Sequence, residues 1–276
     1  NLMTKNNIKT IATFHNVYGG NSYLKKMYNK GLSKMDHLVA ISDYVKETIV
    51  NKYNLQPNNI SVINRGVDTE YFNQPIDVGI RDNILKTHQI DTAKKIILFP
   101  ARITSWKGQL EFIDVIKKID TQNILLLFAG DTKNESYTKL VQNKIEQNNL
   151  ESVCKILGSV NQDEMRSLYQ IADLSVSFPL RAEGFGRTVS ESLYSKTTVL
   201  AFDYGGVKNQ LANLSEIFKV KPQDYQALPA KIEQLLGLSE VEKKEALEGV
   251  QSVIESNFSK INMVKQYLKL YESFKS

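Results

Sequence analysis

The feature that most constrains the fold is the alternation of short apolar runs with amphipathic segments along the chain. The apolar runs, such as ILLLFAG at 124–130, are mostly continuous, which is typical of strands buried on both faces of a parallel sheet. Because segments with helical periodicity lie between them, the sequence predicts an α/β doubly wound architecture with helices on both faces. The predicted strands are 8–14, 37–41, 60–63, 96–101, 124–130, 153–157, 174–178, 198–202 and 217–220.

This rhythm is interrupted at 64–95, a polar segment that contains Pro75 and two glycines. We interpret the segment as a connection between two domains. After it, 94–256 holds enough strand–helix repeats for a complete Rossmann-like domain, whereas 1–63 holds three strands and two helices, too few for a full sheet. The predicted division is a partial N-terminal domain over 1–75, a C-terminal domain over 76–257 and a final helix over 258–276 that returns to the N-terminal side.

Composition limits the partners and the compartment. The single cysteine, Cys154, excludes an internal disulfide framework and a multi-cysteine metal site, and it suits a reducing cytoplasm. The net charge of +5 favours anionic partners, but the charge is spread along the chain, so we expect no nucleic acid partner. No apolar run approaches the ~20 residues that span a membrane, and the first residues fit neither a signal peptide nor a transit peptide. We expect a cytoplasmic protein that can lie on a membrane without crossing it.

The first loop that carries chemistry follows the predicted strand 96–101. Arg102 comes directly after this strand, and Lys107 and Gly108 open the next helix. In doubly wound folds ligands bind beyond the carboxyl ends of the strands, and two cations beside a helix N-terminus suit a diphosphate. The alternative is that Arg102 forms a structural ion pair and Lys107 is solvated.

The second loop is RAEGFGRTVSE at 181–191, which leads from a strand into a helix. Gly184 and Gly186 let backbone N–H groups approach an anion without obstruction by a Cβ. Glu183 precedes these amides, and Glu191 lies about one turn inside the helix, where a carboxylate can accept hydrogen bonds from two ribose hydroxyls. Such a site suits a ligand that carries hydroxyls and phosphates together. A plain helix cap explains the glutamates but not the glycines and the arginine.

Two further strand exits are weaker signals. The Gly-rich turn at 203–206 faces the same edge of the predicted sheet, and a plain tight turn explains it equally well. The LGSV stretch at 157–160 also ends a strand, and its backbone groups could contact the edge of a base.

Several other kinds of site are disfavoured. The chain has no G-x-x-x-x-G-K-[ST] motif, and a dinucleotide fingerprint would need glycine at Val189. No Asp-x-Asp pair occurs, and His15, His37 and His88 lack metal-ligand spacing, so we expect neither a metal nor another cofactor. The charge of a bound diphosphate must then be neutralised by Arg, Lys and backbone dipoles.

These motifs together resemble the retaining glycosyltransferases of family 4, which have the GT-B fold of two Rossmann-like domains. FPARITSWKG resembles the family's loop for the donor diphosphate, and EGFGRTVSE resembles its signature of two glutamates. SVINRGVDTEYF resembles its interdomain strand, and FHNVYGG the strand end whose histidine, here His15, faces the donor sugar. The final segment, FSKINMVKQYLKLYESF, resembles the helix that crosses back to the N-terminal domain.

The resemblance implies transfer of a hexose from a nucleoside diphosphate sugar, with retention and without a metal. The acceptor would be a saccharide or a lipid-linked molecule, and the wording of FHNVY and INRGVD is closest to members that build lipopolysaccharide cores at the inner face of a bacterial membrane. The expected catalytic residues are Arg102, Lys107, Glu183 and His15. The expected donor-binding residues are Gly184, Phe185, Gly186, Arg187, Thr188, Glu191, Ser159 and Val160.

The sequence also departs from the family pattern. The strands and Gly-rich loop that normally precede the histidine are not present, so we expect a truncated chain or a missing part supplied elsewhere. Arg65 stands where many members have asparagine, Lys196–Thr197–Thr198 replaces a more usual Gly-x-Pro, and Asn209–Gln210 lies where an acidic residue often follows. Two alternatives stay open, a non-catalytic donor-binding module and, less favoured, an NAD-linked Rossmann enzyme.

Overall fold

The computed structural model describes residues 8–16 and 23–274, and within them the strands form two parallel sheets. The predicted α/β architecture is confirmed. The smaller sheet has the order β1-β2-β3, with β1 at Ile11–Phe14, β2 at His37–Ala40 and β3 at Ile60–Val62. The larger sheet has the order β6-β5-β4-β7-β8-β9, with strands at Lys95–Pro100 (β4), Ile124–Ala129 (β5), Cys154–Gly158 (β6), Leu174–Ser177 (β7), Val199–Phe202 (β8) and Lys219–Val220 (β9).

The strand order of the larger sheet determines where a ligand can bind. From β4 the chain adds β5 and β6 on one side of the sheet, and it then returns to add β7, β8 and β9 on the other side of β4. The segments that follow β4 and β7 therefore lead to opposite sides of the sheet, which leaves a crevice between them at the carboxyl ends of these strands. Such a crevice is the usual binding position in doubly wound sheets. The first two chemically loaded loops of the sequence follow these two strands.

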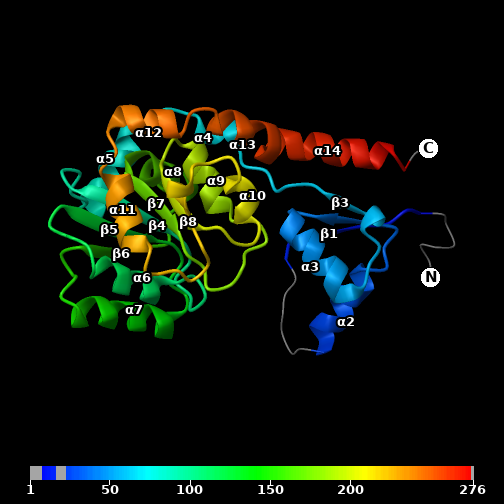
Figure 1. Cartoon of the computed structure of the whole chain (residues 1–276), viewed down its shortest axis with the longest axis horizontal. Helices are drawn as coiled ribbons and strands as arrows, with labels where there is room; N and C mark the ends of the chain where they lie inside the picture. The colour runs from blue at the N-terminus through cyan, green and yellow to red at the C-terminus, as the bar shows by residue number, and fades with distance from the viewer. Residues whose placement is uncertain (1–7, 17–22, 275–276) are drawn as a thin grey trace.

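Helices cover both sheets (Figure 1). Those of the smaller unit are α2 at Tyr23–Leu32 and α3 at Asp43–Tyr53. Those around the larger sheet are α5 at Val78–Thr87, α6 at Gln109–Ile116, α7 at Glu135–Gln147, α8 at Gln162–Ile171, α9 at Arg187–Tyr194, α10 at Val207–Leu211 and α11 at Leu228–Leu236. The chain then continues through α12 at Glu240–Ala246, α13 at Val250–Phe258 and α14 at Lys260–Glu272. No helix in the described ranges combines the length and apolarity needed to cross a bilayer.

The segment 64–95 contains more structure than the predicted connection. It includes α4 at Thr69–Phe72 and the ten-residue α5, which packs against α8 and buries Ile84. Asp77 caps α5 by accepting a hydrogen bond from the Ile80 amide at 3.0 Å. The polar composition concealed this helix because only a narrow apolar face is buried. The exact domain boundaries stay a prediction.

Two further helical segments follow β9. The apolar spacing of Leu228, Ile232 and Leu235 forms α11, which the strand–helix pattern did not single out. The segment 239–256 forms two helices, α12 and α13, which are separated at Gly249, whose φ of 73° lies in the left-handed region.

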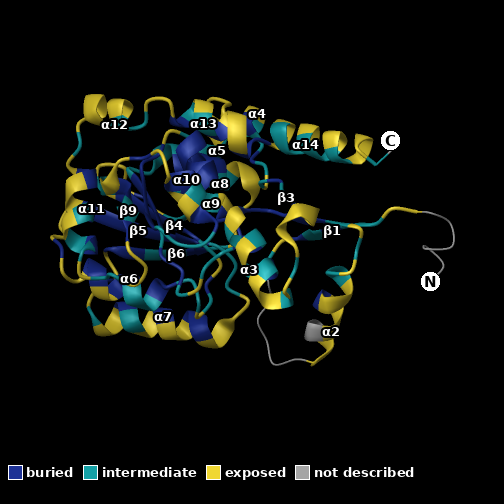
Figure 2. Ribbon diagram, turned by 45° about the vertical axis from the view of Figure 1, so that its right-hand side comes forward, coloured by how far each residue is buried: buried dark blue, intermediate teal, exposed yellow. Residues whose placement is uncertain are grey.

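The core confirms the interpretation of the continuous apolar runs. Every residue of β5 is buried, and the adjacent β4 is buried from Ile96 onward. Phe99 lies at the centre, with ring centroids 5.5 Å from Phe112 and 5.6 Å from Phe128. Figure 2 shows the buried residues gathered on the strands and on the inner faces of the helices, while the outward faces of α7 and α12 are exposed.

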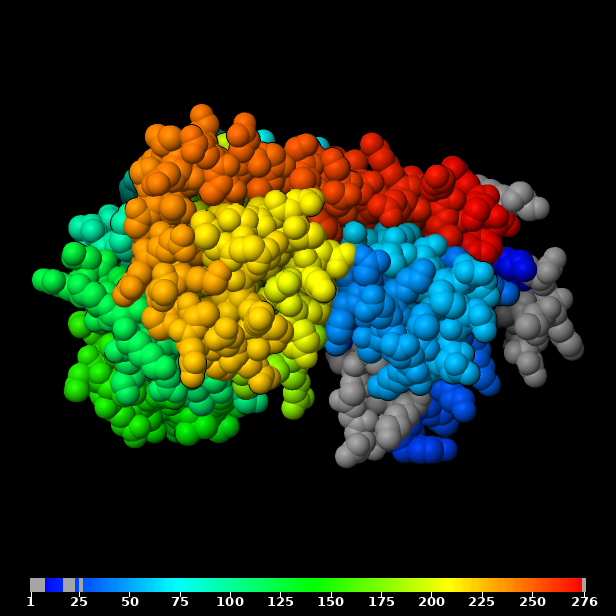
Figure 3. Space-filling model, in the orientation of Figure 1, coloured from blue at the N-terminus to red at the C-terminus, as the bar shows by residue number. Residues whose placement is uncertain are grey.

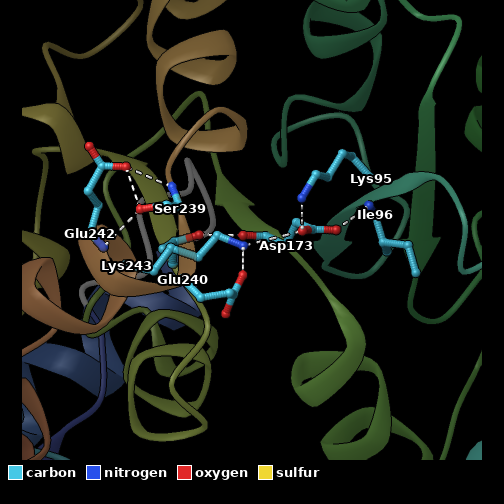
Figure 4. A network of polar contacts seen from close by, with 8 residues as sticks. Lys95, Ile96, Asp173, Ser239, Glu240, Glu242 and Lys243 are labelled. Carbon is cyan, nitrogen blue, oxygen red and sulfur yellow. Dashed lines mark hydrogen bonds and ion pairs between the residues drawn. The ribbon is translucent and has the colours of Figure 1, made fainter.

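A network at the amino ends of the strands holds α12 against the larger sheet (Figure 4). Asp173 accepts hydrogen bonds from the Ile96 amide at 2.9 Å, from Lys95 at 3.0 Å and from Lys243 of α12 at 3.3 Å. Burial would raise the pKa of Asp173, but these hydrogen bonds and the two cations hold it below its usual value. The network lies at the edge opposite the strand exits, so it leaves those exits free.

The chain passes between the two units at two adjacent places. The Val67 amide donates to the Phe258 carbonyl at 2.7 Å, and the Lys260 amide donates to the Val67 carbonyl at 2.7 Å. A parallel bridge thus joins Val67 to Ser259, the residue between α13 and α14. From this point α14 continues over the smaller sheet, where Tyr267 hydrogen-bonds Thr13 of β1 at 3.0 Å (Figure 3).

Candidate active site

The loops after β4 and β7 meet at the crevice of the larger sheet. The Leu180 amide donates to the Trp106 carbonyl at 2.8 Å, which ties the two loops together. Next to this bond Lys107 forms an ion pair with Glu183, and each side chain is only 14% exposed. The Lys107 ammonium also lies 4.5 Å from the centroid of the Trp106 ring. Two predicted site residues, 76 positions apart in the sequence, are therefore in direct contact.

Glu191 lies in a buried polar cluster on α9. Its carboxylate accepts from Arg187 Nε at 2.8 Å and from the Tyr169 hydroxyl at 3.0 Å. Burial raises the pKa of Glu191, although the charges of Arg187 and Arg65 and the Tyr169 hydrogen bond oppose this shift. Tyr169 was not among the predicted site residues, and its only signal in the sequence was a phenol within a helical segment. These two contacts hold both oxygens of the Glu191 carboxylate in place on α9.

The turn before α9 is conformationally restricted to glycine. Gly186 has a φ of 83°, and an added Cβ would lie 2.3 Å from Cγ2 of Val207. No side chain caps α9, so its first amides are not used by a capping hydroxyl or carboxylate. This N-terminus, with the half-buried Thr188 in its first turn, offers backbone donors to an anion.

Gln210 braces the same turn from α10. Its side-chain amide donates to the Phe185 carbonyl and accepts from the Ser190 hydroxyl, and Gln210 itself is buried. The sequence marked this position only as a departure from the family pattern. In the structure, Gln210 fixes the main chain of the Gly-rich turn.

The smaller unit closes over the Gly-rich turn. The Ser42 hydroxyl, at the end of β2, donates to the Gly184 carbonyl at 2.6 Å. An added Cβ at Gly184 would lie 2.4 Å from the His15 carbonyl oxygen, so only glycine permits this approach. Asn209 of α10 also donates to Asp43 of α3. The structure thereby brings His15, at the exit of β1, beside the predicted donor loop.

Three further predicted residues, Arg102, Ser159 and Val160, lie in the loops after β4 and β6. Arg102 is exposed directly after β4, and its carbonyl accepts from the Gln109 side chain at 2.9 Å. Ser159 is exposed and Val160 half-buried after β6, which is an edge strand separated from β4 by β5. Phe185 is buried. The functional roles expected for these residues, like those of all the predicted site residues, stay predictions.

The charged groups at the crevice can contact an anion. Among residues 8–16 and 23–274, no group of three or more His, Cys, Asp or Glu side chains could hold a metal. Lys107, Arg187 and the exposed Arg102 supply positive charge, and the first amides of α9 add backbone dipoles. Glu183 and Glu191 supply acceptors for hydroxyls. A ligand with phosphates and sugar hydroxyls matches this set.

Solved structures with a similar fold define the class as glycosyltransferases of the GT-B fold. A glycosyltransferase from Rickettsia africae is 30% identical, with a TM-score of 0.88 over 100% of this chain and 73% of that chain. HepE from Anabaena, solved with UDP and glucose, is 18% identical, with a TM-score of 0.84 over 98% of this chain and 73% of that chain. The second likeness concerns the fold alone.

The sequence profile described as "Glycosyl transferases group 1" matches residues 80–248, and that of "Glycosyltransferase Family 4" matches residues 1–71. The chain belongs to the group 1 glycosyl transferases. Among curated relatives, a phosphatidylinositol N-acetylglucosaminyltransferase subunit of Saccharomyces cerevisiae is 24% identical over 76% of this chain and 46% of its own length. Trehalose synthase of Thermococcus litoralis is 29% identical over 69% of this chain and 48% of its own length. The chain thus spans about half the length of these relatives.

Proposed function

We propose that the protein transfers a hexose from a nucleoside diphosphate sugar to a saccharide or lipid-linked acceptor, with retention of the anomeric configuration and without a metal ion. The observation that carries this proposal is the contact between Lys107 and Glu183 beside the uncapped N-terminus of α9. The pair places a cation for phosphate and a carboxylate for sugar hydroxyls at one point of the crevice.

Each group has a distinct role in this proposal. The diphosphate competes with Glu183 for Lys107, and the released carboxylate then accepts hydrogen bonds from the sugar. Lys107 and Arg102 stabilise the leaving diphosphate as its charge develops, which favours the transition state over the bound substrate. Glu191, oriented by Arg187 and Tyr169, accepts hydrogen bonds from the ribose. His15 faces the donor sugar from the smaller unit.

The names of relatives and structural neighbours support the substrate classes. The HepE structure contains UDP and glucose, which favours a uridine donor. One curated relative is named for phosphatidylinositol and another for trehalose, so related chains act with lipid and saccharide molecules. A lipopolysaccharide-core acceptor belongs to the proposal on the resemblance of FHNVY and INRGVD.

A peripheral position on an anionic membrane is also part of the proposal, and α2 supports it. Tyr23, Leu24, Met27 and Tyr28 are 76%, 69%, 55% and 67% exposed on this helix. The segment 23–35 contains four lysines and no acidic residue, a combination typical of helices that lie on anionic bilayers. Binding to phosphatidylserine vesicles but not to phosphatidylcholine vesicles, reduced in Leu24→Ser, is the expected result.

The test of the donor site is thermal stabilisation by UDP, GDP and ADP sugars without metal. We expect one nucleotide to raise the Tm, and Glu191→Ala to abolish that shift. Lys107→Ala should reduce transfer at least ~10-fold, since a charge-assisted hydrogen bond contributes about 1.5–3 kcal/mol, and should reduce donor affinity less. Lys133→Ala, a change at a 91% exposed lysine side chain after β5, is the control.

Two results separate the proposal from its alternatives. Donor binding without transfer to any acceptor would favour a donor-binding module. Stabilisation by a nicotinamide dinucleotide instead of a nucleotide sugar would contradict the proposed donor. Unchanged transfer by Lys107→Ala would remove the leaving-group role from that residue.

A further inference from the structure

A cavity of ≈ 600 Å³ lies on the smaller unit beside the exit of β1. Its walls are formed by the end of β1, by α2 and by Arg65, which follows β3. It contains none of the donor-site residues of the larger unit, but His15 lines it with its neighbour Asn16. Because the His15 carbonyl adjoins Gly184, a molecule in this cavity would border the place proposed for the donor sugar.

Arg65 supplies positive charge to the wall of the cavity, and His15 is an ionisable group beside it. No Asp or Glu is among the described residues that line the cavity. Arg65 is exposed, and within the described part of the chain no carboxylate forms an ion pair with it. An unpaired guanidinium presents a planar set of donors that matches phosphate and carboxylate oxygens.

Arg65 also lies close enough to act on both sides of the interface between the units. Partial desolvation and the charge of Arg65 lower the pKa of His15, and the same charge opposes the raised pKa of Glu191. Arg65 lines the cavity, and its charge also acts on the donor-site carboxylate of Glu191. A negative group bound to Arg65 would lie next to the transferred sugar.

The opposite wall of the cavity is apolar. Leu24, Tyr28 and Leu32 of α2 line it, and the first two side chains are largely exposed. Asn29, buried beneath them, adds a polar amide. An apolar wall facing a few converging polar groups is typical of a site for a small organic molecule.

We propose that this cavity is an acceptor subsite and that Arg65 selects acceptors carrying a phosphate or carboxylate group close to the hydroxyl that receives the sugar. The inference rests on the proposed glycosyl transfer, and it adds the chemical class of the acceptor. Arg65 is thus a specificity-determining residue, whereas Lys107 and Glu183 serve the donor.

The test uses the full chain with UDP present and three matched probes: hexyl phosphate, hexanoate and neutral hexanol. The nitrogen resonances of His15 report occupancy, and His37 and His88 are internal controls because the chain has three histidines. We expect the two anions to raise the pKa of His15 and hexanol to leave it unchanged. Arg65→Asn should weaken binding of both anions about 10-fold or more and leave UDP affinity unchanged.

The control variant is Arg81→Asn, which removes the same charge from α5 on the far side of the larger unit. It should retain both anion affinities. Equal effects of hexanol and hexyl phosphate, or unchanged anion binding by Arg65→Asn, would overturn the inference. Loss of UDP affinity in Arg65→Asn with anion binding intact would also overturn it, because Arg65 would then belong to the donor diphosphate.

Two further measurements are needed. The first distinguishes a lipid headgroup from a soluble acceptor as the source of the anion, and the second distinguishes failure of the acceptor inference from failure of the proposed function. Arg65-dependent binding to vesicles containing phosphatidic acid would assign the anion to a lipid headgroup, and binding of hexyl phosphate alone would assign it to a soluble acceptor; both support the subsite. If no nucleotide sugar binds the parent chain, the proposed function fails. If donors bind and the anion probes do not, only the acceptor inference fails.

Discussion

At the scale of single residues, each glutamate of the candidate site is paired with a cation. Lys107 and Glu183 pair where only 14% of each side chain is exposed, and Arg187 pairs with Glu191. Leaving one partner of such a pair alone in a poorly solvated place is costly. A donor that contacts both members of each pair is therefore favoured over one that contacts only a cation.

The buried Glu191 should make stability depend on pH. Its pKa is raised, so the folded protein holds this proton more tightly than the unfolded chain, and its contribution to the free energy of unfolding falls as pH rises above about 4.5. We expect the stability of the parent relative to Glu191→Gln to decrease between pH 4.5 and pH 7 in urea unfolding. A parent-to-variant difference that does not vary with pH would contradict the raised pKa.

The Gly-rich turn should tolerate no side chain. Gly186 and Gly249 both have positive φ, of 83° and 73°, but only at Gly186 would a Cβ clash with a neighbour. Gly249→Ala should lose roughly 1–2 kcal/mol from the left-handed backbone alone. Gly186→Ala should lose about 3 kcal/mol, because overpacking against Val207 adds to that strain. Chemical denaturation of both variants measures the difference, and equal losses would mean that Val207 moves aside freely.

At the scale of elements, the sequence predicted what depends on local patterns. Continuous apolar runs identified β4 and β5, and the position of Glu191 one turn inside a helix followed from the glycines before α9. The helix α5 was missed because its apolar face is narrow and lies in a polar segment, whereas α11 buries four apolar residues and follows the short strand β9 at the end of the strand–helix pattern. Periodicity reports the width of the buried face, so elements that bury little give a weak signal.

The last helix, α14, should stabilise the smaller unit through one hydroxyl. Tyr267→Phe removes the 3.0 Å hydrogen bond to Thr13, and we expect a loss of about 0.5–1.5 kcal/mol. Tyr271→Phe is the matched control on the same helix, since Tyr271 is 50% exposed. Hydrogen exchange at β1 should increase in the first variant and stay unchanged in the second. Similar exchange in both would show that α14 docks without this bond.

At the scale of the whole molecule, contacts between residues far apart in the sequence determine the geometry of the site. The Lys107–Glu183 pair, the Tyr169–Glu191 bond and the Ser42–Gly184 bond join positions 76, 22 and 142 residues apart. No local pattern encodes these pairings, because they arise when two loops or two units pack together. The residue types of the site could be predicted from the sequence, whereas its pairing could not.

Separation of the two units should be necessary for turnover. Asp43 and Asn209 are in contact across the interface, so Asp43→Cys with Asn209→Cys can be joined by a short reducible cross-linker. The native Cys154 should not react, because burial raises the pKa of its thiol to about 12. We expect transfer to stop on cross-linking and to return on reduction. The singly substituted Asn209→Cys variant treated with the same reagent should stay active, and full activity of the linked form would mean that the units need not separate.

The parallel bridge between Val67 and Ser259 restricts how the two units can move relative to one another. Both passages of the chain between the units run side by side there, held by two backbone hydrogen bonds of 2.7 Å. Translation of one unit along the other would shear both bonds at once, whereas rotation about the bridge leaves them intact. We therefore expect the two units to move by rotation about this bridge, as about a hinge, and not by sliding past each other.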